Sequence, residues 1–369
     1  MSEVNTLVSS DFNLERVSTK ELSEHMYATI QMEGNLCVFG RRGSGKTEIA
    51  KQQIAKSNTK EIYINLSVLE RVDMGGYPNV MGCGKDEFIS VILPKIYEPL
   101  IKGNDNYTVL LDEVDKADSS IWAPLLEFTQ SHSINGMKFK NLKSIIMTGN
   151  LISEGGHKPS APLLDRCEAY LLEADATSWL TWGGMNKIHP SILAFIADNM
   201  TYLFGGVDPE DRYKDPSPRG WHRSSNITYQ GEKLNLSTEI IGKKISGCVG
   251  KEAGMKYFQY YEYYQQLLPM INSIFEGKNI MKEYDALEPT KKIVSTMMVC
   301  SRFSTEVDKS CGRDNGLISN VGRFLNQISQ EDAYIAVRTQ IQLLRIFKYR
   351  LNDYTEWKEV FDKFKLVDD

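Results

Sequence analysis

The chain has 369 residues and contains 43 Lys and Arg against 48 Asp and Glu, for a formal net charge of -5 at pH 7. Its hydrophobic content of 41% and charged content of 25% are typical of globular proteins, and the length suffices for two or three domains. The acidic balance gives no overall attraction for nucleic acid, and no apolar run approaches the roughly 20 residues of a membrane-spanning helix.

The N-terminal stretch, MSEVNTLVSSDFNLERVSTK, lacks a basic start followed by an apolar core. We therefore expect no secretory signal and a cytoplasmic location. The six cysteines show none of the spacings of a zinc or redox site, which favours reduced thiols.

The first half of the chain alternates short apolar runs with helical patterns. The runs of strand length lie at residues 36–39, 62–66, 108–111 and 144–147. Such alternation predicts a parallel sheet covered by helices on both faces. The sequence INGMKF (residues 134–139) has Asn-Gly between apolar residues and predicts a β-hairpin. From about Trp179 onward the strand signals stop and the pattern becomes helical.

A glycine-rich loop follows the first predicted strand. Residues 40–47, GRRGSGKT, match the pattern GxxxxGK[ST] between a strand and a helix, which is the context of a phosphate-binding loop. Its glycines let backbone N–H groups approach phosphates, and the helix N-terminus adds a favourable dipole. Lys46 would neutralise the β- and γ-phosphates, and Thr47 would offer its hydroxyl to Mg²⁺.

A flexible Gly/Arg turn is the alternative. The predicted ATP-binding residues are Gly40, Gly43, Ser44, Gly45, Lys46 and Thr47.

An acidic pair ends the third apolar run, in YTVLLDEVDKAD (residues 107–118). Open parallel sheets bind ligands at the carboxyl ends of their strands. We predict that Asp112 holds Mg²⁺, directly or through water, and that Glu113 polarises the water that attacks the γ-phosphorus. On its own an acidic pair after a strand is more often the start of a solvated loop.

Two further polar residues follow at or near strand ends. Asn150 closes SIIMTGN, where its amide can hold the attacking water or contact the γ-phosphate, although such an Asn is usually a turn residue. Arg166 lies in APLLDRCEAY, where an ordinary surface arginine is the alternative.

Together these segments resemble the AAA+ ATPases, and within them the MoxR branch, especially its bacterial and phage ATP-binding proteins. The resemblance covers about residues 15–280. The segments that carry it are the phosphate loop, LLDE (110–113), TGN (148–150), LLDR (163–166), SPRGW (217–221), DMGGYP (73–78) and the pattern from Trp179 to Ile196. Cys167 departs from the branch, which commonly has Phe after Asp-Arg.

The resemblance implies roles for several residues. Asn150 would be the sensor 1 residue, and Arg166 the arginine finger that enters the neighbouring subunit's site, which requires a homo-oligomeric ring, expected to be a hexamer. Arg219 would be sensor 2, a lid arginine on the γ-phosphate, although an arginine at a helix start after Pro218 is an alternative. Asn65 lies where many AAA+ proteins restrain the catalytic glutamate, and a strand-ending Asn explains it equally well.

The resemblance also implies the fold and its division. We expect an α/β P-loop AAA+ core over residues 1–177, an α-helical lid over 178–280 and a helical C-terminal extension over 281–369. Residues 71–106 would hold the insert that this branch places within helix 2, facing the pore of the ring. Tyr77 is then a candidate substrate contact, and a Tyr buried beside a turn is the alternative.

The expected function is a ring-forming ATPase that uses ATP/ADP and Mg²⁺ to remodel a protein partner. A von Willebrand A-domain partner is implied by the resemblance alone. The alternatives are an ATP-driven nucleic-acid motor or loader and a nucleotide-switched scaffold. The tyrosines of YFQYYEYYQQLL (257–268) could stack on bases, but Tyr257, Tyr260, Tyr261 and Tyr264 fall on one helical face, which favours packing.

Overall fold

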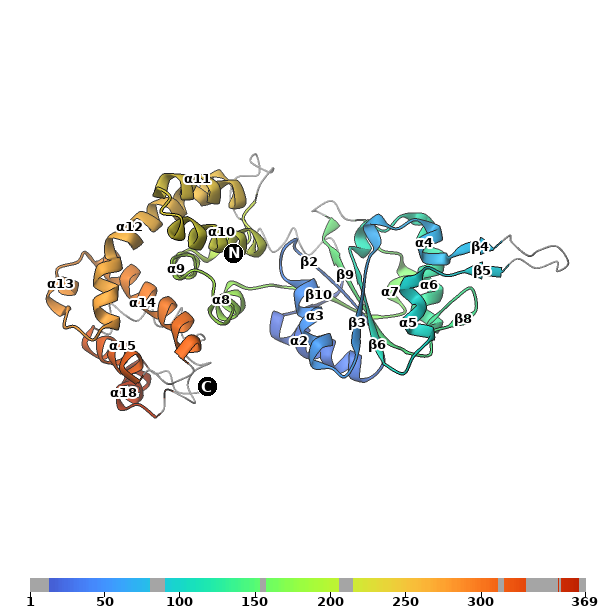
Figure 1. The fold of residues 1–369 in the computed structure, drawn as a ribbon, viewed down its shortest axis with the longest axis horizontal. Coiled ribbons are helices and arrows are strands. Elements are labelled where there is room, and N and C mark those ends of the chain that lie inside the picture. The colour runs from blue at the N-terminus through green and yellow to red at the C-terminus, as the bar shows by residue number, and fades with distance from the viewer. Residues whose placement is uncertain are drawn as a thin grey trace. The chain divides into compact units, whose positions relative to one another are not determined.

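The computed structural model shows two compact units, residues 1–174 and 175–369. It describes residues 13–79, 90–152, 157–205, 215–310, 315–329, 351 and 353–364. The first unit contains all the strands of these described ranges, and the second is helical (Figure 1).

The first unit is built on a parallel sheet of six strands. Its strand order is β1-β10-β2-β9-β6-β3, and every neighbouring pair is parallel. The strands are β1 (Glu15–Val17), β2 (Asn35–Gly40), β3 (Lys60–Asn65), β6 (Tyr107–Asp112), β9 (Leu142–Asn150) and β10 (Glu168–Leu172). The four apolar runs of the sequence form β2, β3, β6 and β9, as predicted.

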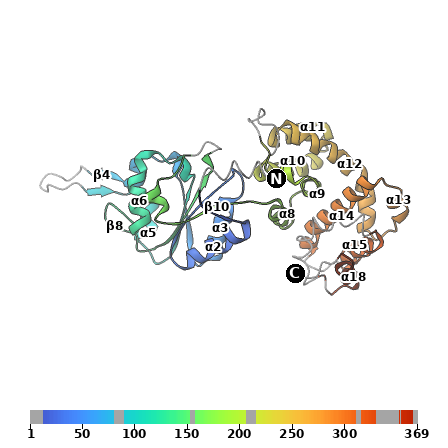
Figure 2. The same cartoon turned by 180° about the vertical axis from the view of Figure 1, so that it is seen from behind.

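Helices cover both faces of this sheet because successive strand residues point to opposite sides. In β2, Leu36 and Val38 are buried with α2 and α3, whereas Cys37 and Phe39 are buried in the cluster on the opposite face. The covering helices, visible in Figures 1 and 2, are α2 (Thr19–Gln31) and α3 (Lys46–Lys56) on one face and α4 (Arg71–Gly75), α5 (Glu98–Ile101), α6 (Trp122–Ser131) and α7 (Ala161–Leu164) on the other. The predicted class, an α/β P-loop core followed by a helical region, is confirmed.

Short elements connect these layers. The Asn135-Gly136 turn has positive φ at both residues, 50° and 74°, and joins an antiparallel pair, as INGMKF predicts. A second antiparallel pair lies within the predicted insert, and residues 80–89 between its strands lie outside the described residues. The short elements are β4 (Tyr77–Asn79), β5 (Ser90–Ile92), β7 (Ser133–Ile134), β8 (Met137–Lys138) and the 3₁₀ turns η1 (Leu66–Val68), η2 (Lys95–Tyr97), η3 (Val114–Lys116) and η4 (Ser119–Ile121).

The second unit packs its helices around one hydrophobic cluster. Its elements are α8 (Ala176–Met185), α9 (Pro190–Asp198), η6 (Met200–Leu203), α10 (Pro218–Lys233), α11 (Thr238–Val249), α12 (Lys251–Phe275), α13 (Met281–Asp285), α14 (Pro289–Ser310), α15 (Asn315–Gln327) and α18 (Thr355–Lys363). Within the described ranges, none of the helices has the length and apolar character needed to span a bilayer.

The tyrosine-rich face of α12 lies inside this cluster. Tyr257, Tyr260, Tyr261 and Tyr264 are all at most 7% exposed. Tyr257 and Tyr261 are stacked with ring centroids 5.8 Å apart, and Tyr257 also contacts Phe195 edge to face. Buried rings cannot stack on bases, so the packing interpretation of this face is confirmed.

The C-terminal helices contribute to the same cluster through Trp357 of α18. Its fully buried ring stacks on Phe303 of α14 at a centroid distance of 4.8 Å. Its indole N–H donates a hydrogen bond of 2.8 Å to the carbonyl oxygen of Ile318 in α15. One side chain therefore joins three helices. The boundary predicted at residue 280 stays a prediction.

We expect Trp357→Ala to lower the free energy of unfolding by about 3–5 kcal/mol, because it leaves a large cavity in the helical core. Chemical denaturation of the full chain, followed by circular dichroism, measures this loss. Lys358→Ala, at an exposed position of the same helix, is the control and should change stability little. Equal stabilities of the two variants would contradict this account of the helical core.

Candidate functional site

The phosphate loop joins β2 to α3, and its glycines adopt the backbone conformations that it requires. Gly43 and Gly45 have φ of 74° and 93°, a region that strains other L-residues. The Ser44 hydroxyl is enclosed and has no hydrogen-bond partner among the described residues. An enclosed hydroxyl of this kind fits a phosphate oxygen, which would satisfy it. Gly45 precedes Lys46, the first residue of α3, so the loop ends at a helix N-terminus.

Lys46 is directed back over this loop. Its side chain is buried, and its Nζ donates hydrogen bonds of 2.8 Å to the carbonyl oxygens of Gly40 and Arg41. A third contact, of 3.3 Å, reaches Oδ1 of Asn150. The register of the sheet explains this contact, because β9 lies beside β2 and pairs Asn150 with Gly40. The ammonium is therefore fixed between the phosphate loop and the end of β9.

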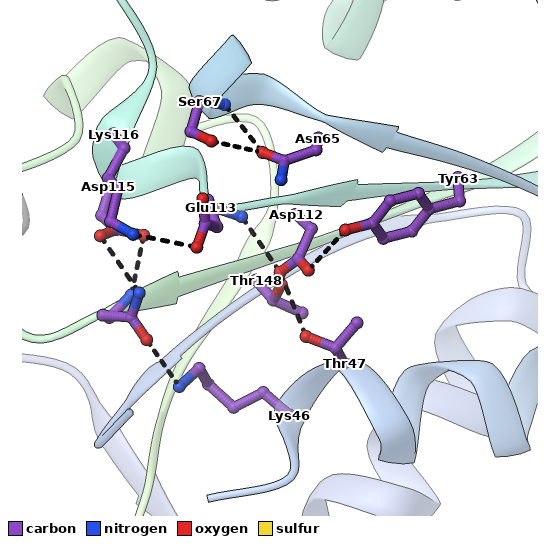
Figure 3. A network of polar contacts seen from close by, with 11 residues as sticks. Lys46, Thr47, Tyr63, Asn65, Ser67, Asp112, Glu113, Asp115, Lys116 and Thr148 are labelled. Carbon is purple, nitrogen blue, oxygen red and sulfur yellow. Dashed lines mark hydrogen bonds and ion pairs between the residues drawn. The ribbon is translucent and has the colours of Figure 1, made fainter. Parts of the chain in front are cut away.

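Asp112 ends β6 and accepts hydrogen bonds from three separate elements (Figure 3). Its Oδ1 accepts from the hydroxyl of Thr47 in α3 at 3.1 Å and from the hydroxyl of Thr148 in β9. Its Oδ2 accepts from the phenol of Tyr63 in β3 at 3.0 Å. The Thr47 hydroxyl and the Asp112 carboxylate are hard oxygen donors, which are the ligands that Mg²⁺ prefers. They are the two residues that the sequence predicts for Mg²⁺.

Glu113 follows in a left-handed conformation with φ of 58°, which is uncommon for a residue with a Cβ. Its Oε1 accepts a bond of 2.9 Å from Nζ of Lys116. Two neighbours lower the pKa of the Glu113 carboxyl below its ordinary value. The Ser67 hydroxyl has the larger effect and the Lys116 ammonium the next. Ser67 is itself held by Asn65, whose Oδ1 accepts from its backbone N–H at 2.9 Å and its hydroxyl at 2.8 Å. Asn65 thus lies beside the glutamate, where the resemblance expects a restraining residue.

Asn150 is oriented by a buried carboxylate that the sequence analysis did not identify. Asp115 is 1% exposed, and its Oδ1 accepts the backbone N–H of Asn150 at 2.9 Å. Its Oδ2 lies 3.4 Å from Nδ2 of Asn150. The amide therefore presents Oδ1, an acceptor, toward Lys46. Asp115 lies only two residues after Glu113 in the sequence, but only the fold shows that its partner is Asn150.

The structure thus brings together Lys46, Thr47, Asp112 and Glu113 at the carboxyl edge of the sheet (Figure 3). Asn150 joins them through its contact with Lys46. Gly43, Ser44 and Gly45 belong to the phosphate loop of the same site.

Arg166 follows α7, and its Nε and Nη2 donate to Oε1 of Gln130 in α6 at 3.2 and 3.0 Å. Arg219 is exposed in the first turn of α10, in the helical unit. Tyr77 is 48% exposed, so the alternative of a buried Tyr beside a turn is wrong, and its phenol donates to Asp73 at 3.0 Å. The roles of these three residues in a finger, a sensor and a pore stay predictions.

No protein-family model and no curated protein matches the sequence. The solved structures that are similar to this chain include the RuvB Holliday junction branch migration motor of Thermotoga maritima, at 14% identity over 62% of this chain and 67% of that chain, with a TM-score of 0.36. Hsp104 with ATPγS and casein is 17% identical over 51% of this chain and 39% of that chain, with a TM-score of 0.35.

Proposed function

We propose that this protein binds and hydrolyses ATP. The observation that carries the proposal is the convergence of Lys46, Asp112, Glu113 and Asn150 beside a phosphate loop at the carboxyl edge of a parallel sheet. Figure 3 shows the first three of these residues. Phosphoryl transfer requires positioning and charge stabilisation more than covalent chemistry. These side chains supply a cation, oxygen donors, a base and a polar amide within one network.

Each group has a distinct task in the proposed reaction. The loop N–H groups and Lys46 bind the phosphates and offset their negative charge. Thr47 and Asp112 would hold Mg²⁺, which supplies further positive charge at the phosphate oxygens when bound. Glu113 accepts a proton from the attacking water. Oδ1 of Asn150 is an acceptor and can orient that water.

We further propose that the protein is an AAA+ ATPase of MoxR type that acts in a homo-oligomeric ring, as a hexamer, in the cytoplasm. The motifs named above support this proposal by their order along the chain. Arg166 would complete the neighbouring subunit's site as an arginine finger, where such a group contributes about 10³ to 10⁵ in rate. Arg219 would contact the γ-phosphate from the lid.

The proposed output is remodelling of a protein partner, with a von Willebrand A-domain protein as one candidate. Burial of the α12 tyrosines removes the feature of the sequence that favoured base stacking. The insert that contains β4 and β5 displays Tyr77 and Ile92, which pair across the strands and are 48% and 55% exposed. Exposed apolar side chains of this kind suit contact with an unfolded or loosely folded polypeptide.

We expect Glu113→Gln to retain ATP binding and to lower kcat about 10²- to 10⁴-fold, because an amide cannot accept the proton of the attacking water. A phosphate-release assay and nucleotide binding by calorimetry measure the two effects. Glu98→Gln is the matched control, since Glu98 forms a comparable pair with Lys102 at 3.1 Å away from the site. Full turnover by Glu113→Gln would remove Glu113 from the role of base.

We expect Ser67→Ala to move the acid limb of the kcat/KM profile to higher pH. Glu113 works as a base only when ionised, so the rate falls as the pH falls through its pKa. The Ser67 hydroxyl is the largest cause that lowers this pKa, so its removal raises the pKa toward the ordinary value. The control is Ser178→Ala, which removes the hydroxyl that donates to Oδ2 of Asp175 in the helical unit. An unchanged acid limb would show that another group sets it.

We expect tagged Glu113→Gln protein to retain a specific protein client from its native cells when ATP and Mg²⁺ are present. A stalled ATPase holds its substrate because the step that releases it is blocked. The measurement is a pull-down with nuclease treatment, followed by mass spectrometry, and Lys46→Ala should lose the client because it cannot hold the phosphates. Recovery of only nuclease-sensitive DNA or RNA would instead indicate a nucleic-acid motor.

A further inference from the structure

Tyr63 contacts the site from the edge strand of the sheet, and no motif of the sequence accounts for it. Its phenol donates a hydrogen bond of 3.0 Å to Oδ2 of Asp112 (Figure 3). The contact arises from the register, because β3 pairs with β6 so that Asn65 lies opposite Asp112. Tyr63 lies two residues before Asn65 and therefore points to the same face of the sheet.

The ring of Tyr63 is held in place, although 40% of the residue is exposed. Nζ of Lys51, in α3, lies 4.9 Å from the centroid of the ring and 4.0 Å from Oε1 of Glu61. A cation over the face of a tyrosine stabilises that ring orientation.

The two carboxylate oxygens of Asp112 have different partners. Oδ1 accepts from Thr47, Thr148 and the backbone N–H of Glu113, whereas Oδ2 accepts from Tyr63. A carboxylate can rotate about its Cβ–Cγ bond, which would exchange the two oxygens. The phenol opposes this rotation because it holds Oδ2, the oxygen that does not contact Thr47.

We propose that Tyr63 is a positioning residue that fixes the Asp112 carboxylate with one oxygen toward Thr47, and thereby sets the affinity of the site for the divalent cation that accompanies ATP. The inference rests on the proposed function. Groups that orient metal-binding carboxylates contribute to metal affinity without touching the metal. The contacts of Tyr63 described above are to Asp112 and Lys51, so its effect falls on the cation that Asp112 would hold.

The test is Tyr63→Phe, which removes the hydroxyl and keeps the ring under Lys51. Mn²⁺ binding to the full chain is measured by electron paramagnetic resonance in the presence of a saturating, non-hydrolysable ATP analogue. We expect the affinity for Mn²⁺ to fall about tenfold, in the range for loss of an orienting partner. The affinity for the same analogue in EDTA, measured by calorimetry, should stay unchanged. A general structural defect would instead lower this metal-free affinity as well.

The matched control is Tyr170→Phe, which removes a phenol that donates to Oε2 of Glu168 at 3.2 Å in the same sheet, and it should leave the Mn²⁺ affinity at the wild-type value. Equal Mn²⁺ affinities for wild type and Tyr63→Phe would overturn the inference alone. Parallel loss of Mn²⁺ and metal-free nucleotide binding in Tyr63→Phe would also overturn it. Failure of the wild-type chain to bind the nucleotide and Mn²⁺ would overturn the proposed function and the inference with it.

Discussion

The carboxylate of Asp112 is the point on which the arrangement of the site depends. A carboxylate at the end of a buried strand loses much of its water and needs hydrogen-bond donors in its place. Here Thr47, Thr148 and Tyr63 supply them from α3, β9 and β3. The donors come from both neighbouring strands and from the helix that follows the phosphate loop. One charge thereby fixes the positions of four elements relative to one another.

Strand order makes this convergence possible. After β2 the chain runs to the edge of the sheet, where it forms β3. It then returns to form β6 and finally β9, which lies directly beside β2. Asn150 then pairs with Gly40, and Met147 pairs with Leu111 on the other side. The phosphate loop, the acidic pair and the polar amide are far apart in sequence, but their strands end at one edge. The connection pattern, more than any single contact, creates the site.

Local patterns were sufficient to predict those parts of the fold and of the candidate site that lie within one segment of the sequence. The phosphate loop, the strand that ends at Asp112 and the Asn-Gly hairpin each have turn and period signals within a few residues. Tyr63 and Asp115 lacked such signals, because their partners follow 49 and 35 residues later and depend on register and strand order.

The state of Glu113 bears on how the proposed reaction is controlled. The Ser67 hydroxyl beside Glu113 and the Lys116 ammonium paired with it lower the pKa of the Glu113 carboxyl, and a weaker base removes a proton from water less readily. The exposed ion pair itself is worth little, since water and salt screen it. Exchange of these partners for the attacking water is therefore energetically accessible. In the proposed reaction Glu113 would exchange its bond with Lys116 for one with the attacking water, from a backbone position whose positive φ is uncommon for a residue with a Cβ.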